Sequence, residues 1–210
     1  MLLRFERQAW TKGHRRVAGV DEAGRGPLAG PVVAAAVVFD PDFIEHHASR
    51  LFDGLTDSKR LSESRRDFFF GLLLECAQAG IGVGQADVNE IDARNILRAT
   101  HLAMARALAQ LDPAPDHALV DGRPVPDLPC SSTAIVGGDG RSLSIAAASV
   151  VAKVTRDRIM VELDRQYPNY GFARHKGYGT PEHLRALRKY GPTPVHRRSF
   201  EPVYQPSLDL

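Results

Sequence analysis

Two adjacent carboxylates, Asp21 and Glu22, end a short apolar run and are followed after Ala23 by the glycine-rich segment Gly24-Arg25-Gly26. Carboxylate oxygens are preferred ligands of Mg²⁺ and Mn²⁺, so this pair could hold divalent cations. The backbone N–H groups of a glycine-rich turn, together with an arginine, could hold a phosphate or a sugar. The alternative is that both acids are ordinary turn residues, and this segment alone leaves that alternative open.

The strand that carries the two acids sets a geometric condition. Neighbouring side chains on a regular strand point to opposite faces of the sheet. If Asp21 and Glu22 serve one site, the strand must therefore end or twist at Glu22. The glycines that follow Glu22 favour such a change of direction.

Asp121 and Asp139 repeat the pattern of an acid beside glycine after an apolar run. Sites in α/β sheets form beyond the strand ends, so we expect both acids to lie close to Asp21 and Glu22. No Cys or His cluster offers softer ligands, and the expected occupants are therefore Mg²⁺ or Mn²⁺. Two such ions about 4 Å apart would stabilise the attacking and leaving oxygens of a phosphoryl displacement. Asp157 is a rival fourth acid, but its place between two arginines within a helix favours a structural ion pair.

The segment from residue 174 to residue 198 contains seven Lys or Arg and one acid, Glu182. A basic segment that faces an acidic site suggests a polyanionic substrate, and the alternative is a solvated surface. Tyr178 lies in this segment between two glycines, where its residue type alone favours packing in a turn. Lys59 could contact a phosphate, although solvation at a helix entry is the simpler interpretation. We interpret three histidines of the segment as basic-surface or packing residues: His175, His183 and His196.

The apolar runs and turn residues predict one mixed α/β layer, in which a central five-stranded sheet is flanked by helices and followed by a small helical C-terminal part. We expect antiparallel pairing among the first strands and helical crossovers between the later ones. The expected strands are 17–22, 31–39, 81–86, 118–121 and 133–136. The expected helices begin at Ser62 or Ser64, Asn89, Ser144 and Pro181, and the stretch 40–57 is expected to be a loop with at most a short helical turn.

Two of these helices have a predicted buried face and a predicted end. The faces comprise Phe68, Phe69, Leu72, Leu73 and Cys76 in the helix that should close at Gly80, and Leu97, Met104, Leu108 and Leu111 in the helix that should end at Pro113. In each set the apolar residues recur at helical spacing.

The composition is that of one globular domain with its own core, at 210 residues, 43% hydrophobic and 25% charged. The two cysteines have no metal-ligand spacing and are too few for a disulfide framework. Charged residues interrupt the N-terminal apolar run, and no apolar run is long enough to span a bilayer. We therefore expect no signal peptide, no membrane partner and a cytoplasmic location.

The run from residue 19 to residue 36, GVDEAGRGPLAGPVVAAA, resembles the signature of bacterial ribonuclease HII. The likeness continues in order along nearly the whole chain. The further motifs are Asp57-Ser58-Lys59, Val120-Asp121-Gly122, Gly138-Asp139, the stretch 146–158, His175-Lys176-Gly177-Tyr178-Gly179-Thr180 and His196-Arg197-Arg198-Ser199-Phe200. The chain is similar to the short bacterial forms that carry no helical extension.

The resemblance implies a ribonuclease H-like fold and metal-dependent endonucleolytic cleavage with Mn²⁺ or Mg²⁺. The implied substrates are RNA–DNA hybrids and duplex DNA with an embedded ribonucleotide, cut on its 5′ side to leave a 3′-hydroxyl and a 5′-phosphate. The implied site consists of the metal-binding acids Asp21, Glu22, Asp121 and Asp139, the loop Gly24-Arg25-Gly26, and a junction-sensing Tyr178. We expect a monomer in which residues 1–170 form the catalytic domain and residues 171–210 a basic C-terminal segment packed on it.

Two other functions are weighed against this one. An integrase- or resolvase-like DNA nuclease would use the same fold and acids but would lack a means of sensing the 2′-hydroxyl, which separates RNA from DNA. The Gly24-Arg25-Gly26 loop together with Tyr178 argues for such a means. A non-catalytic nucleic-acid-binding module would carry its acids as structural residues.

Overall fold

The computed structural model describes residues 2–203, which form a mixed five-stranded sheet with the strand order β3-β2-β1-β4-β5. The strands are β1 (Val17–Ala23), β2 (Val32–Phe39), β3 (Ala79–Ala86), β4 (His117–Asp121) and β5 (Ser131–Ile135). The first three strands pair antiparallel, whereas β4 pairs parallel with both β1 and β5. The predicted mixed sheet is therefore confirmed.

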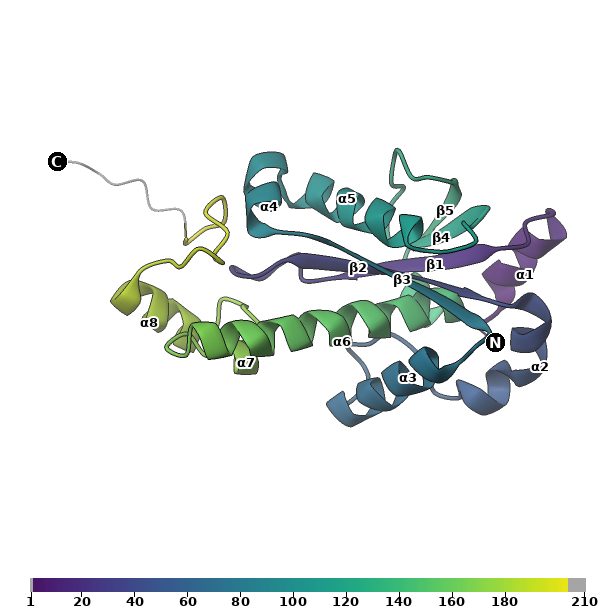
Figure 1. The fold of residues 1–210 in the computed structure, drawn as a ribbon, viewed down its shortest axis with the longest axis horizontal. Coiled ribbons are helices and arrows are strands. Elements are labelled where there is room, and N and C mark those ends of the chain that lie inside the picture. Colours follow the sequence, from purple (N-terminus) through teal and green to yellow (C-terminus); the bar gives the residue numbers. More distant parts are fainter. Residues whose placement is uncertain (1, 204–210) are drawn as a thin grey trace.

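Helices cover both faces of the sheet, with α4 and α5 on one face and α6 and α3 on the other (Figure 1). The helices are α1 (Arg4–Thr11), α2 (Pro41–Leu51), α3 (Glu63–Glu75), α4 (Val88–Arg94), α5 (Ile96–Ala109), the short 3₁₀ helix η1 (Gly138–Gly140), α6 (Leu143–Gln166), α7 (Phe172–His175) and α8 (Pro181–Tyr190). No helix among residues 2–203 is long and apolar enough to cross a membrane.

The strand β2 is buried along its whole length because both of its faces meet helices. Ala35 and Val37 pack into the cluster on the α6 side, and Ala34 and Ala36 pack into the cluster on the α5 side. On β1, Gly19 lets α6 approach the sheet closely, since a Cβ at this position would lie 2.0 Å from the main chain of Ser144. The long helix α6 therefore lies flush against the strand that carries Asp21.

The stretch 40–57, which was expected to be mostly loop, contains the 11-residue helix α2, so that prediction was wrong. Asp40 caps this helix by accepting a hydrogen bond from the N–H of Phe43 at 2.8 Å. Pro41 occupies the first helical position, where its missing N–H costs nothing. An Asp-Pro pair that is typical of a turn is here a helix start.

The helix α3 begins at the Ser62 cap, one of the two predicted caps, but ends at Glu75 rather than at Gly80. Phe69 and Leu73 of its predicted buried face are buried, whereas Phe68 is 56% exposed and Phe70, which was not predicted, is buried. Cys76 follows the helix and is only partly buried, so it is not the predicted core residue. Gly80 belongs to β3.

The single helix predicted for 89–113 is two helices, α4 and α5, which meet at Asn95. Asn95 has a φ of 66° and caps α5 by accepting hydrogen bonds from the N–H groups of Leu97 and Arg98. Leu97 is 50% exposed, so it does not share the buried face of Met104. The following long helix, α6, is capped by Ser142 rather than by the predicted Ser144.

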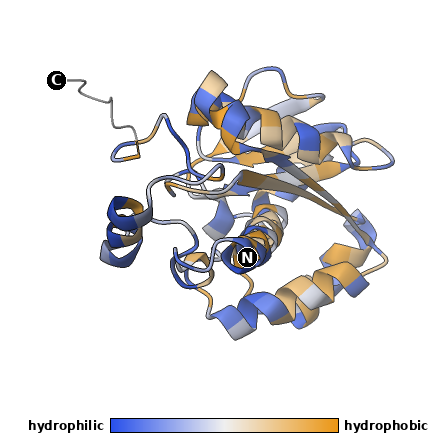
Figure 2. Cartoon of the chain, turned by 60° about the vertical axis from the view of Figure 1, so that its left-hand side comes forward, coloured by the Kyte–Doolittle hydropathy of each residue, from blue (hydrophilic) through white to orange (hydrophobic). Residues whose placement is uncertain are grey.

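The chain after α6 packs against the end of that helix. Met160 of α6 forms a small apolar cluster with Ala29, Tyr170, Phe172 and Ala186. The helix α8 is mostly hydrophilic in colour, in contrast to the strands of the sheet (Figure 2). The last residues of the predicted C-terminal segment, 204–210, lie outside the described residues.

Candidate active site

Three carboxylates meet at one edge of the sheet. Strands β1 and β4 run parallel with Val20 opposite Val120, so the next residues along each strand, Asp21 and Asp121, lie side by side. Asp139 completes the group, and one carboxylate oxygen from each of the three acids lies within 4.8 Å of the others. The structure therefore brings together three of the four predicted acids. They are called the acid triad below.

Asp139 reaches the triad from a position that differs from the predicted strand end. The strand β5 ends at Ile135, and Asp139 lies in the 3₁₀ helix η1 that follows. The N–H of Gly138 donates a hydrogen bond of 2.6 Å to Oδ1 of Asp121, which fixes η1 against β4. The turn after β5 thus carries the third acid to the other two.

Glu22 lies beside the triad but is not part of it. The strand β1 keeps its pairing with β2 through Ala23, so the end of the strand expected at Glu22 does not occur. Glu22 still lies within electrostatic reach of the triad, because its charge adds to burial in raising the pKa of Asp21. Asp21 shares the face of Gly19, toward α6, and Glu22 shares the face of Val20, toward α5. Glu22 pairs instead with Arg25 at 3.3 Å.

The triad concentrates negative charge that the protein balances only in part. Burial raises the pKa of Asp21 well above its ordinary value, and the charges of Glu22 and Asp121 raise it further. Burial and repulsion from Asp121 also raise the pKa of Asp139. Burial alone would lower the pKa of Lys59, but the carboxylates around it, Asp21 foremost, hold that pKa above its ordinary value. A donor set made only of oxygens with an excess of negative charge suits a hard divalent cation.

Glu22 and the other predicted site residues line a groove of about 650 Å³. It is lined by Gly24, Arg25, Gly26, Lys59 and Tyr178, together with Ser58, Arg66, Ile96, Lys153 and Arg156. The ring of Tyr178 is 46% exposed and flanks Gly26, where an added Cβ would lie 3.7 Å from its Cε1 atom. The glycine loop and the tyrosine therefore face one groove, although 152 positions separate Gly26 from Tyr178 in the sequence.

Two buried arginines that sequence reasoning did not single out pack against this loop and the segment that follows it. Arg156 and Arg197 are 1% and 0% exposed and donate hydrogen bonds to main-chain carbonyls of residues 24–31. Gly24 has a φ of +93°, and a Cβ there would lie 1.9 Å from Nε of Arg156. Arg197 counts as a basic surface residue by composition, and its neighbours in the sequence carry no signal of burial.

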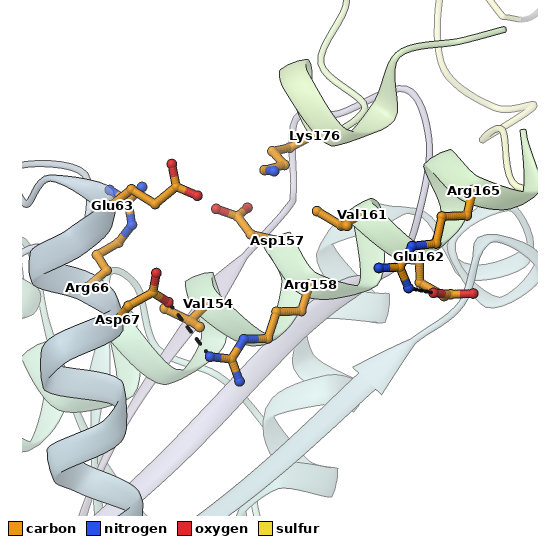
Figure 3. A pocket seen from close by; sticks show the side chains of 10 residues that line it. All are labelled: Glu63, Arg66, Asp67, Val154, Asp157, Arg158, Val161, Glu162, Arg165 and Lys176. Atoms are coloured by element: carbon orange, nitrogen blue, oxygen red, sulfur yellow. Dashed lines mark hydrogen bonds and ion pairs between the residues drawn. The ribbon is translucent and has the colours of Figure 1, made fainter. Parts of the chain in front are cut away.

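The rival acid Asp157 lies outside the triad. It accepts a hydrogen bond of 2.6 Å from Lys153 one turn earlier on α6, as an ion-pair member would. Asp157 lines a pocket of about 410 Å³ between α3 and α6. Figure 3 shows that side chains of both charges line it. Within that pocket Arg158 pairs with Asp67 at 3.7 Å. This mixed surface lacks the concentrated charge of the triad.

The histidines of the C-terminal segment are packing residues rather than ligands of the triad. His183 and His196 are buried, and their Nε2 atoms lie 3.0 Å apart. His175 stacks on His183 with ring centroids 4.6 Å apart. None of the three belongs to the acid triad.

The family model described as ribonuclease HII matches residues 18–203, a range that includes the acid triad and every element that lines the groove. The chain belongs to the ribonuclease HII family. The ribonuclease HII of Geobacillus kaustophilus is 56% identical over 202 residues, which cover 96% of this chain and 74% of that protein. The ribonuclease HII of Coxiella burnetii is 52% identical over 95% of both chains.

The fold agrees with this membership. The crystal structure of ribonuclease H2 from Pyrococcus horikoshii superposes with a TM-score of 0.73 at 31% identity, covering 90% of this chain and 95% of that one. The chain is therefore a ribonuclease H-type endonuclease with a ribonuclease H-like fold. The family is dependent on a divalent metal, and the acid triad of this chain offers oxygen ligands that suit such an ion.

Proposed function

We propose that this protein hydrolyses the RNA strand of RNA–DNA hybrids and cuts on the 5′ side of ribonucleotides embedded in duplex DNA. The products would be a 3′-hydroxyl and a 5′-phosphate. The observation that carries the proposal is that the acid triad adjoins the loop Gly24-Arg25-Gly26 and the exposed Tyr178. Asp121 lines a pocket with Glu22 and Arg25, and these two residues also line the groove of the loop and Tyr178. Hydrolysis, ribose selection and junction selection each need one of these elements.

The acid triad is assigned to binding two divalent cations, Mn²⁺ or Mg²⁺, with Glu22 as a further ligand from the opposite face of β1. Such ions supply positive charge to the attacking and leaving oxygens of the phosphodiester. Asp21 and Asp121 come from neighbouring strands of a rigid sheet, so the protein holds their oxygens in place before the substrate binds. This arrangement supplies the positioning and charge that phosphodiester hydrolysis requires.

Substrate selection is assigned to the groove. Glycine lets the main chain of residues 24–26 come close to a sugar, where its N–H groups can contact the 2′-hydroxyl that distinguishes RNA from DNA. Tyr178 would stack on the deoxyribose that follows the ribonucleotide and so detect the RNA–DNA junction. Arg25 would leave its ion pair with Glu22 and bind the adjacent phosphate, and Lys59 would contact a neighbouring phosphate. Since one chain supplies all of these groups, we infer that the enzyme acts as a monomer.

The decisive experiment compares three duplexes in Mn²⁺ and in Mg²⁺: all-DNA, DNA with one ribonucleotide, and an RNA–DNA hybrid. We expect cleavage of the second and third and none of the first, with the ends identified by ligation and phosphatase treatment. Equal cleavage of all three would establish a DNA nuclease of the same fold. The variant Asp121→Asn should still bind the hybrid in Ca²⁺ and should lose cleavage, and binding without cleavage by the wild type would indicate a binding module.

A further inference from the structure

Arg197 is fully buried, yet it forms no ion pair with any carboxylate of residues 2–203. Its guanidinium donates to main-chain carbonyls instead. Nη2 lies 2.6 Å from the oxygen of Gly24 and 2.8 Å from that of Gly30, Nη1 lies 2.9 Å from the oxygen of Arg25, and Nε lies 2.9 Å from that of Gly30. An isolated buried cation is costly, and these carbonyls offset the cost by accepting its hydrogen bonds.

These contacts fix the direction of two peptide groups. The C=O and N–H of a trans peptide point in opposite directions. The carbonyl of Gly24 points at the buried guanidinium, so the N–H of Arg25 points away from it. The carbonyl of Arg25 fixes the N–H of Gly26 in the same way. Neither N–H donates a hydrogen bond within the described part of the chain, and both residues line the groove beside Tyr178.

We propose that Arg197 is a positioning residue for ribose recognition: by holding the carbonyls of Gly24 and Arg25, it aims the N–H groups of Arg25 and Gly26 at the 2′-oxygen of the substrate. The inference rests on the function proposed above for the glycine loop. It deepens that function by assigning the orientation of the loop to a buried cation from the C-terminal segment. The protein places both donors before the substrate arrives, so no reorganisation is needed when the sugar binds.

Arg156 provides a matched control within the same structure. It is equally buried and also donates to main-chain carbonyls, those of Pro31 at 3.0 Å, Lys176 at 3.0 Å and Ala29 at 3.1 Å. It packs directly beneath Gly24, but it donates to no carbonyl of residues 24–26. The two arginines therefore share burial, charge and proximity to the loop and differ in the peptide groups that they orient.

The test compares Arg197→Lys with Arg156→Lys. Lysine keeps the charge but lacks the planar fork that reaches several carbonyls at once. For each protein, kcat and KM are measured on duplex DNA with a single ribonucleotide and on the same duplex with a 2′-fluoro nucleotide, whose fluorine is a poor acceptor. We expect Arg197→Lys to lower the ribonucleotide-to-fluoro ratio of kcat/KM by about 10-fold or more, mainly through kcat. Arg156→Lys should lower Tm by a similar amount and leave that ratio within about twofold of wild type.

A wild-type ratio in Arg197→Lys, or an equal loss of the ratio in Arg156→Lys, would overturn the positioning role. If lysine is not accommodated, Arg197→Gln keeps two donors without the charge and is expected to show the same loss. Equal cleavage of both duplexes by the wild type would refute the sensing of the 2′-hydroxyl itself, and the present inference with it. The wild type alone reveals whether the 2′-hydroxyl is sensed. This result is therefore distinct from an unchanged ratio in Arg197→Lys, which would refute only the role of Arg197.

Discussion

The acid triad and the pair of buried arginines lie close together in one fold, and each concentrates charge of a single sign. The arginines are surrounded by main-chain carbonyls that accept their hydrogen bonds. The acids mainly face one another, with Lys59 as the nearby cation, while Arg25 pairs with the neighbouring Glu22. The protein thus supplies hydrogen-bond partners for the charges of the two arginines, whereas it balances the negative charge of the acid triad only in part.

The pKa values express this difference. Burial lowers the pKa of Arg156 to about 10 and that of Arg197 to about 9, so both arginines keep their charge at neutral pH. Burial and mutual repulsion raise the pKa of Asp21 well above its ordinary value, so its charged form is disfavoured in the isolated protein. Charge that the protein itself satisfies serves the structure, and charge left unsatisfied at a groove marks the place for an external cation.

The largest expected effect is that of Asp21→Asn on cleavage. The carbonyl oxygen of asparagine can still accept the hydrogen bond that Oδ1 of Asp21 receives from the N–H of Glu22, but the negative charge is lost. We expect cleavage of a single-ribonucleotide duplex to fall at least about 10³-fold, while the free energy of unfolding without metal stays equal or rises. Single-turnover kinetics and urea unfolding measure the two quantities.

A second acid on the same face of the sheet supplies the control for that experiment. Asp157 pairs with Lys153 outside the triad, so Asp157→Asn should cleave within about threefold of wild type. A comparable loss of cleavage in both variants would mean that the triad has no special role. A clear loss of stability in Asp21→Asn would mean that its charge serves the fold.

Removing a buried arginine should lower the stability of the fold, in contrast to removing the charge of Asp21. In Arg156→Met, the carbonyls of Pro31, Ala29 and Lys176 lose their buried donor. We expect the free energy of unfolding to fall by about 3 kcal/mol, measured by urea unfolding. The exposed Arg165, which pairs with Glu162 at the surface, offers the comparison, and Arg165→Met should change stability by less than about 0.5 kcal/mol. Equal effects of the two substitutions would show that burial among carbonyls is not what makes Arg156 structural.

The unsatisfied charge should also make stability depend on divalent metal. Because a ligand that binds only the folded state adds RT ln(1 + [L]/Kd), Mn²⁺ at 100 times its Kd should stabilise the wild type by about 2.7 kcal/mol. The increase in Tm should be much smaller for Asp121→Asn and intact for Arg156→Lys. An equal rise in Tm for the wild type and Asp121→Asn would place the bound ion away from the triad.

The sequence indicated which acids lie close together better than it indicated the face of the sheet on which each acid lies. Asp21 and Asp121 follow short apolar runs that favour buried strands, and the parallel pairing of β1 and β4 makes them neighbours. The place of Glu22 on the opposite face depended on whether β1 continued beyond it, which local residue types leave undetermined. The start of α2 at Asp40 and the break between α4 and α5 at Asn95 depend likewise on single caps.

The buried arginines could not be predicted from the sequence for a different reason. Arg197 stands between His196 and Arg198, and nothing in that composition distinguishes an internal cation from a surface one. Its burial results from the long-range return of the C-terminal segment to the glycine loop, where the N–H of Arg197 donates to the carbonyl of Leu28. Long-range contacts of this kind determine the role of a residue after the fold has formed, and local periodicity does not contain them.

The histidine pair His183 and His196 is a third kind of buried polar group, and its expected effect on stability is the smallest of those considered. His196 accepts a hydrogen bond from the N–H of Thr193 at Nδ1, so its Nε2–H donates to Nε2 of His183. Nδ1–H of His183 then donates to the carbonyl of Tyr178, so both rings are neutral in the folded protein. Burial foremost, and the neighbouring His183, lower the pKa of His196 from 6.5 to about 4.

An imidazole whose pKa is lower in the folded state than in the unfolded state takes up its proton on unfolding. Its contribution to stability is therefore complete above about pH 6.5 and is lost as the pH falls toward 4. Across that pH range, we expect the free energy of unfolding of the wild type, measured in urea, to fall by on the order of 2 kcal/mol more than that of His196→Gln. The glutamine amide of this variant can still donate to His183. The same pH dependence in both proteins would contradict a neutral, buried His196. A steeper dependence in the wild type would show that burial without charge is a third way in which this fold accommodates a polar side chain.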